Sequence, residues 1–236
     1  MTRALALTFD NLGAAAERER GDAPPEPHPS LALLPRLLDL LRELDLPATF
    51  CVEAINTQEH PDAVRAIAAA GHQIALHGWA HERWEGDVES MVRARDAFAA
   101  LGIHPTGYRP PGGALPPGAL RALKAAGLSW CSPEGEHPYV DDDTGIVVVP
   151  FRWPLVDATY LPIPFGDLRE RLGLPRAPLS PHDAERRLRA ELAGDAVLIL
   201  HPFLAADQEV RAMHERLLRH IAAERDAGAL ALYEPP

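Results

Sequence analysis

Residues 4–11 have the sequence ALALTFDN, in which a short apolar run ends at Asp10 and Asn11. A run of this length that stops at a charged residue favours a buried β-strand. The chain contains six further runs of this kind, at 48–52 (ATFCV), 73–77 (QIALH), 128–132, 146–149, 196–201 (AVLILH) and 230–233. Several of these predicted strands end at a polar residue, as the first one does.

Segments with helical periodicity separate the strands. After Ser30, which can cap a helix, leucines recur at the three- and four-residue spacing of a helix. Further helices are predicted at 61–70, 87–101, 116–126, 182–193 and 207–227. This alternation, without linker or repeat, predicts one α/β domain over residues 1–236 with parallel strands and right-handed crossovers. Either a barrel or an open doubly wound sheet would place the chemistry at the carboxyl ends of the strands.

Two segments are predicted to be irregular because they are rich in proline. Residues 13–30 are polar and include Pro24, Pro25 and Pro27, which favours a loop. Residues 151–181 are long and only partly periodic. A segment of that kind inside a domain is typically a lid or a binding segment.

The composition narrows the classes of partner. The chain has 236 residues with 23 Lys+Arg and 34 Asp+Glu, giving a formal net charge of −11. This acidic balance argues against a nucleic-acid partner, which requires clustered basic residues. No apolar run approaches the roughly 18 residues of a membrane span, and the first residues lack a secretory signal. We therefore expect a cytoplasmic protein with no membrane partner, whose oligomeric state, homo-oligomers included, the sequence leaves open.

Reactive side chains lie at the ends of several predicted strands. Asp10 follows the first strand, His77 and His81 follow the third, Arg109 lies in the fourth connection, and His201 ends the 196–201 strand. Each alone could be a helix cap or a packed core residue, but reactive residues at four equivalent strand ends favour a functional site. Two imidazoles four residues apart could bind a divalent metal such as zinc. His28 is expected to lie over the site, because the loop after the first strand should cover it. The remaining histidines are expected to be solvated: His60, His72, His104, His137, His182, His214 and His220.

The motifs that contain these residues resemble those of the polysaccharide deacetylase family, the NodB-homology carbohydrate esterases. Four motifs occur in the family's order: TFDN at 8–11 for TFDD, HGWAH at 77–81 for the HGxxHE form, YRPPGG at 108–113 for RxPxG, and LILH at 198–201 for LxLH. The resemblance covers nearly the whole chain. It implies a distorted (β/α)7 barrel and a place in carbohydrate metabolism, as a hydrolase that removes an N-acetyl group from an amino sugar.

The resemblance also implies a role for each motif residue. Asp10 is the base, which Arg109 orients. His201 is the acid, which Asp157 tethers. The expected metal ligands are Asn11, His77 and His81, holding a divalent ion for which zinc is preferred to nickel, cobalt or manganese. Substrate contacts are expected from the backbone N–H of Gly112 at the oxyanion and from a wall formed by Trp153, Trp79, Trp84 and Tyr160.

Three departures from the family pattern bear on the substrate. Asn11 replaces a carboxylate, Gly112 replaces an aromatic residue, and Gly78 replaces Ser or Thr. The leading hypothesis is a metal-dependent amidohydrolase acting on a small N-acylated, sugar-like molecule. A second is a metal-independent hydrolase of cyclic amides or imides, which Asn11 favours. A third is a binding protein that retains the fold but lost turnover with Asn11.

Overall fold

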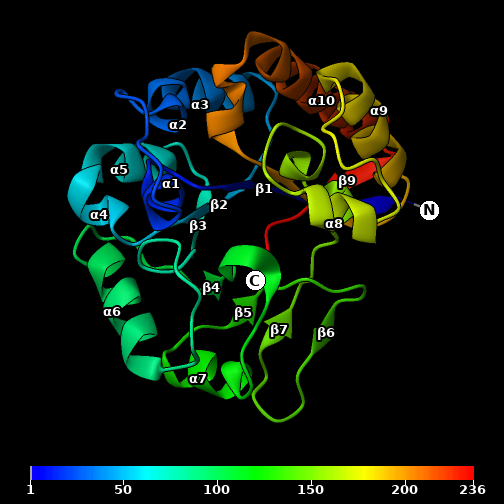
Figure 1. Cartoon of the computed structure of the whole chain (residues 1–236). Coiled ribbons are helices and arrows are strands. Elements are labelled where there is room, and N and C mark those ends of the chain that lie inside the picture. The colour runs from blue at the N-terminus through cyan, green and yellow to red at the C-terminus, as the bar shows by residue number, and fades with distance from the viewer. Residues whose placement is uncertain (1) are drawn as a thin grey trace.

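Seven parallel strands form the framework of the chain, which a computed structural model describes over residues 2–236 (Figure 1). They lie in the order β7-β5-β4-β3-β2-β1-β8. Their bounds are β1 (Arg3–Asp10), β2 (Thr49–Val52), β3 (Gln73–Leu76), β4 (Gly107–Tyr108), β5 (Trp130–Cys131), β7 (Val147–Val148) and β8 (Ala196–Leu200). The sheet curls between two edges, which confirms the predicted distorted (β/α)7 barrel of NodB type.

The two ends of this curled sheet are not joined by a regular strand pair. At the seam between β7 and β8, Val156 forms a single parallel bridge with Ile199. Strand β6 (Tyr139–Val140) pairs antiparallel with β7, and β9 (Leu230–Leu232) pairs with the beginning of β1. The sequence did not predict β6, because its two residues are both exposed and show no apolar pattern.

Most of the helices surround the outside of the sheet, whereas α1 and α8 lie inside this ring in the view of Figure 1. Their bounds are α1 (Ala15–Glu19), α2 (Pro29–Ala32), α3 (Leu34–Glu43), α4 (Asn56–Glu59), α5 (Pro61–Ala69), α6 (Val88–Ala99), α7 (Ala119–Ala125), α8 (Gly166–Arg171), α9 (Pro181–Glu191) and α10 (Gln208–Asp226). The predicted loop at 13–30 was partly wrong, because it contains α1 and the start of α2. The 151–181 segment is irregular as predicted, apart from α8 and two 3₁₀ turns at 153–155 and 157–159.

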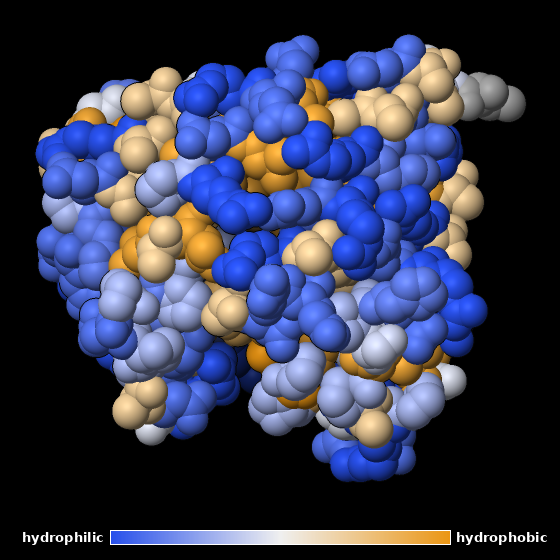
Figure 2. All heavy atoms as spheres, turned by 90° about the horizontal axis from the view of Figure 1, so that it is seen from above, coloured by the Kyte–Doolittle hydropathy of each residue, from blue (hydrophilic) through white to orange (hydrophobic). Residues whose placement is uncertain are grey.

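The register of β1 positions the site. Phe9 pairs with Leu200 of β8, so Asp10 and His201, the next residues along these two strands, extend the register at the same edge of the sheet. The last six residues of β1 are buried, which fixes this central strand. Hydrophilic residues predominate on the face in Figure 2, and apolar residues form only separate patches there. Among residues 2–236, no helix has the length and apolar character needed to cross a bilayer.

Candidate active site

Asp10 lies at the end of β1 and forms a buried ion pair with Arg109, the residue that follows β4. Arg109 Nη1 donates to Asp10 Oδ1 at 2.8 Å and to Thr8 Oγ1 at 2.7 Å, while Nη2 donates to Ser132 Oγ at 3.0 Å. The side chain of Arg109 is 1% exposed and that of Asp10 is 6% exposed. Sequence reasoning paired Asp10 with Arg109 but missed Thr8 and Ser132, which hold the guanidinium in one orientation.

The electrostatic surroundings keep Asp10 ionised. Burial favours its neutral form, but the charge of Arg109, with a smaller contribution from His201, outweighs burial and lowers the pKa of Asp10 below its usual value. A buried carboxylate that stays charged and opens into a cavity can accept a proton.

His77 and His81 each have one ring nitrogen already engaged. His77 Nδ1 donates to the carbonyl oxygen of Arg109 at 2.9 Å, and His81 Nδ1 donates to Glu19 Oε2 at 3.1 Å. Because both partners are acceptors, the proton of each neutral imidazole is on Nδ1, and Nε2 keeps its lone pair. Burial lowers the pKa of His77 to about 3, so that this ring remains neutral. Glu19, on α1, was not predicted.

These residues fit a divalent metal through their donor chemistry. Two imidazoles, whose rings lie 5.0 Å apart between centroids, each offer the Nε2 lone pair in the neutral form, and carboxylates or carbonyls that anchor the other nitrogen are typical of metal-binding histidines. Asn11 lines the same cavity and has an amide oxygen where the family pattern has a carboxylate. Asn11 and His81 both have positive φ (67° and 68°), a backbone strain that often occurs at functional sites. Within residues 2–236, no three His, Cys, Asp or Glu side chains form a metal-binding group.

Asp157 anchors the second half of the site, on the irregular seam segment. Its Oδ1 accepts from His201 Nδ1 at 2.6 Å and from the Ala158 backbone N–H at 2.6 Å. Its Oδ2 accepts from the His201 backbone N–H at 2.8 Å and from His214 Nε2 at 2.9 Å. The carboxylate is fully buried and has four donors, which fixes it and leaves His201 Nε2 free.

The pKa values of this pair move apart. Burial raises the pKa of Asp157, but His201 and then His214 outweigh burial, and the pKa falls well below its usual range. Burial lowers the pKa of His201, but Asp157, with help from Asp10, more than compensates and raises it. His201 can therefore carry a proton on Nε2 near neutral pH, which is what a general acid requires.

His214 corrects the prediction that it is solvated. It is buried on α10 and contacts Asp157 directly. The signal was present in the sequence, because position 214 shares the helical spacing of the buried residues Val210, Leu217 and Ile221. His28 is also buried and bonds Ser30 at 2.8 Å, but it does not line the cavity as expected.

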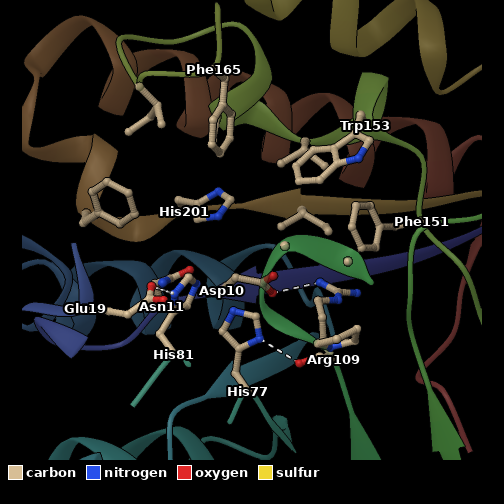
Figure 3. Close-up of a pocket in the computed structure, with 18 of the residues that line it drawn as sticks. Asp10, Asn11, Glu19, His77, His81, Arg109, Phe151, Trp153, Phe165 and His201 are labelled. Atoms are coloured by element: carbon tan, nitrogen blue, oxygen red, sulfur yellow. Dashed lines mark hydrogen bonds and ion pairs between the residues drawn. The ribbon is translucent and has the colours of Figure 1, made fainter. Parts of the chain in front are cut away.

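Asp10, Asn11, His77, His81 and His201 line one cavity of about 210 Å³ (Figure 3). In this view Asp10 lies between His77 and His201. Most of the remaining wall is apolar, and its members include Phe151, Trp153, Val156, Ile163, Phe165 and Phe203. Gly112 also lines the cavity, in a 3₁₀ turn where its φ of 70° favours glycine.

Three aromatic residues expected in the wall lie elsewhere. Tyr160 is buried and its hydroxyl donates to the carbonyl of Pro154 at 2.9 Å. The guanidinium of Arg93 stacks on the ring of Trp79, with Arg93 Cζ 3.7 Å from the ring centroid. Trp84 is buried, and its indole N–H donates to the carbonyl of Asp87. All three serve packing outside the cavity, so Trp153 alone of the four contributes to its wall.

Most of the residues of this site lie in a region that is similar to known proteins. A family model described as polysaccharide deacetylase matches residues 2–130, more than half of the chain. The chain belongs to the polysaccharide deacetylase family. The matched region contains the strands that position Asp10, Asn11, His77, His81 and Arg109.

Within this polysaccharide deacetylase family, the peptidoglycan-N-acetylglucosamine deacetylase of Bacillus cereus is 29% identical over 107 residues, which cover 42% of this chain. The aligned region spans about half (49%) of that relative's length. A Mycobacterium smegmatis protein assigned to the polysaccharide deacetylases is 29% identical, with a TM-score of 0.77 over 96% of this chain and 85% of that one. PuuE allantoinase, 20% identical, shares the fold with a TM-score of 0.67 over 93% and 84% of the two chains.

Proposed function

We propose that the chain hydrolyses the amide bond of a small N-acylated compound of amino-sugar type. One observation carries this proposal: an ionised carboxylate and a protonatable imidazole, Asp10 and His201, open from adjacent strand ends into one cavity. The lowered pKa of Asp10 keeps its carboxylate deprotonated, and the raised pKa of His201 lets its imidazole carry a proton; these are the protonation states from which a base and an acid start. Membership in the polysaccharide deacetylase family supports an N-acyl group as the target.

The residues divide the reaction between them. Asp10 takes a proton from a water molecule as the water oxygen bonds to the acyl carbon, and Arg109 holds the carboxylate in place. The backbone N–H of Gly112 is available to the developing oxyanion. His201 then gives the proton on Nε2 to the nitrogen as the C–N bond breaks, so that a carboxylic acid and an amine leave. A divalent ion held by His77, His81 and Asn11 would polarise the carbonyl and acidify the water.

The size and chemistry of the cavity support a small substrate. Its volume of about 210 Å³ lies below the roughly 300–1,000 Å³ of pockets for drug-sized ligands. Ile163 and Phe165, from the irregular segment, contribute to its wall. An open groove for a long polysaccharide is a different shape. The apolar wall suits the face of a sugar ring or an acyl chain better than a highly charged polymer.

Asn11 favours a second candidate, the metal-independent hydrolysis of a cyclic amide or imide. A neutral amide removes one negative charge from the expected ligand set, which weakens metal binding. Asp10 and His201 could then act on a ring amide without an ion. A catalytically weakened binding protein is the third reading, and it differs from both in cleaving no amide bond.

The test is an assay of the purified chain with N-acetylglucosamine, its short oligomers and a cyclic imide, before and after exhaustive chelation. We expect amine release from the N-acetylated compounds, lost on chelation and restored by zinc. Ring opening that survives chelation would favour the second candidate. The absence of turnover on every substrate, with activity gained by Asn11→Asp, would favour the third.

A further inference from the structure

His214 is a buried ionisable group that the mechanism above does not use. It lies on α10, is 7% exposed, and its Nε2 is 2.9 Å from Asp157 Oδ2. Because the pKa of Asp157 is strongly lowered, this carboxylate is an acceptor and His214 Nε2 carries the hydrogen. Two imidazoles therefore donate to the two oxygens of one carboxylate, although only His201 faces the cavity.

We propose that His214 is a positioning residue for His201: it takes up part of the hydrogen-bonding capacity of Asp157 and so limits how tightly that carboxylate holds the proton on His201. This role rests on the proposed function, in which His201 must release a proton to the leaving nitrogen. A general acid is most effective when its pKa lies near the working pH. An acid whose carboxylate partner were not shared would hold its proton too strongly.

The hydrogen bonds of Asp157 show that His214 is not needed to hold this carboxylate in place. If His214 is removed, the carboxylate keeps three donors: His201 Nδ1 and the backbone N–H groups of His201 and Ala158. Asp157 then stays ionised and in place, and its charge is shared among fewer hydrogen bonds. The bond to His201 strengthens, and the pKa of His201 rises further.

The other charges near the two histidines are few. Asp10 from β1 and Arg109 beyond β4 act on His201 in opposite directions. His214 also lines a small apolar pocket with Arg36 of α3 and with Arg211 and Glu215 of its own helix. Arg36 and Glu215 pair with each other at 2.6 Å. None of these groups hydrogen-bonds Asp157, so the shared carboxylate is the direct link between the two rings.

The experiment is an NMR titration of His201 in the whole chain, with its imidazole signals assigned by their loss in His201→Gln. We expect His214→Leu to raise the pKa of His201 by about 0.5 unit. Asp157→Asn should lower it by about one unit or more. His214→Gln, which keeps an N–H donor, should restore the wild-type value, and His220→Gln on the same helix should leave it unchanged.

These opposite signs distinguish tuning from structural damage, because a loosened Asp157 would lower the pKa of His201 in both variants. A fall or no change in His214→Leu, with the fold intact by circular dichroism, would overturn the proposal. In an active enzyme the basic limb of kcat/KM should move to higher pH by the same amount. The titration requires no turnover, so a failure of the proposed hydrolase function would appear in the assay and not in the titration.

Discussion

The two halves of the cavity are built in different ways. The base half takes Asp10, Asn11, His77 and His81 from the ends of β1 and β3, inside the regular parallel sheet. The acid half is assembled at the seam, where Asp157 begins a short 3₁₀ turn and holds His201 from the edge strand β8. A strand framework therefore aligns the first half, whereas one carboxylate aligns the second.

This difference decides what the sequence can reveal. In the base half, TFDN and HGWAH each contain their functional residues within five positions, and parallel pairing brings the strand ends together. In the acid half, Asp157 contacts residues 44 and 57 positions away. Such contacts leave no local pattern, so only the family resemblance indicated Asp157. The helical spacing of His214 indicates that it is buried, but not that it contacts Asp157.

Short elements explain most of the remaining errors. Helix α1 has five residues and lies in a proline-rich stretch, so no helical period could form, and its Glu19 was missed with it. Strands β4 and β6 have only two residues each, which is too few to show an alternating pattern in the sequence. The longer buried strands β1 and β8 were predicted within two residues, because burial on both faces produces an unbroken apolar run.

The largest expected effect breaks the base half. Asp10→Asn should lower kcat/KM by about 10³–10⁴-fold, because the proton acceptor is lost. It also leaves Arg109 buried without its carboxylate, which should reduce the free energy of unfolding by about 3–5 kcal/mol. Amine release and urea unfolding measure the two effects. Asp143→Asn, at the exposed pair with Arg121, is the matched control and should change neither; equal losses in both variants would contradict the assignment.

Breaking the acid half should have a somewhat smaller effect that depends on the substrate. His201→Gln removes the proton donor and should lower kcat/KM by about 10²–10³-fold for an N-acetyl amine. An aryl ester with a good leaving group needs no such proton and should lose far less. Rates on the two substrates give the comparison, with the exposed His182→Gln as control. Equal losses on amide and ester would remove His201 from this role.

Glu19 is expected to affect the base half indirectly, through the histidine that it anchors. Glu19→Gln weakens the anchor on His81 Nδ1 and should reduce zinc affinity by about tenfold, while Asn11→Asp should increase it. Calorimetric zinc titration of the apoprotein measures both. Glu59→Gln, whose carboxylate pairs with Arg18 rather than with a histidine of the cavity, serves as control. Unchanged affinity in Glu19→Gln would exclude Glu19 from the metal's surroundings.

The smallest expected effect concerns the apolar wall of the cavity. Phe165 lines the cavity and packs edge-on against Trp153, with ring centroids 5.9 Å apart. Phe165→Ala should raise KM by about 2- to 10-fold with little change in kcat, because it removes contact without touching the proton-transfer groups. Steady-state kinetics on the best substrate tests this. A loss confined to kcat would place Phe165 in the chemical step instead.

The most direct test of the central claim, that both halves act on one amide, is a double-mutant cycle on amine release with Asp10→Asn, His201→Gln and the two combined. If base and acid serve the same bond cleavage, the double variant should lose about as much kcat/KM as the worse single variant. Losses that multiply, as for independent sites, would contradict the account, and so would the absence of amine release from the wild-type chain.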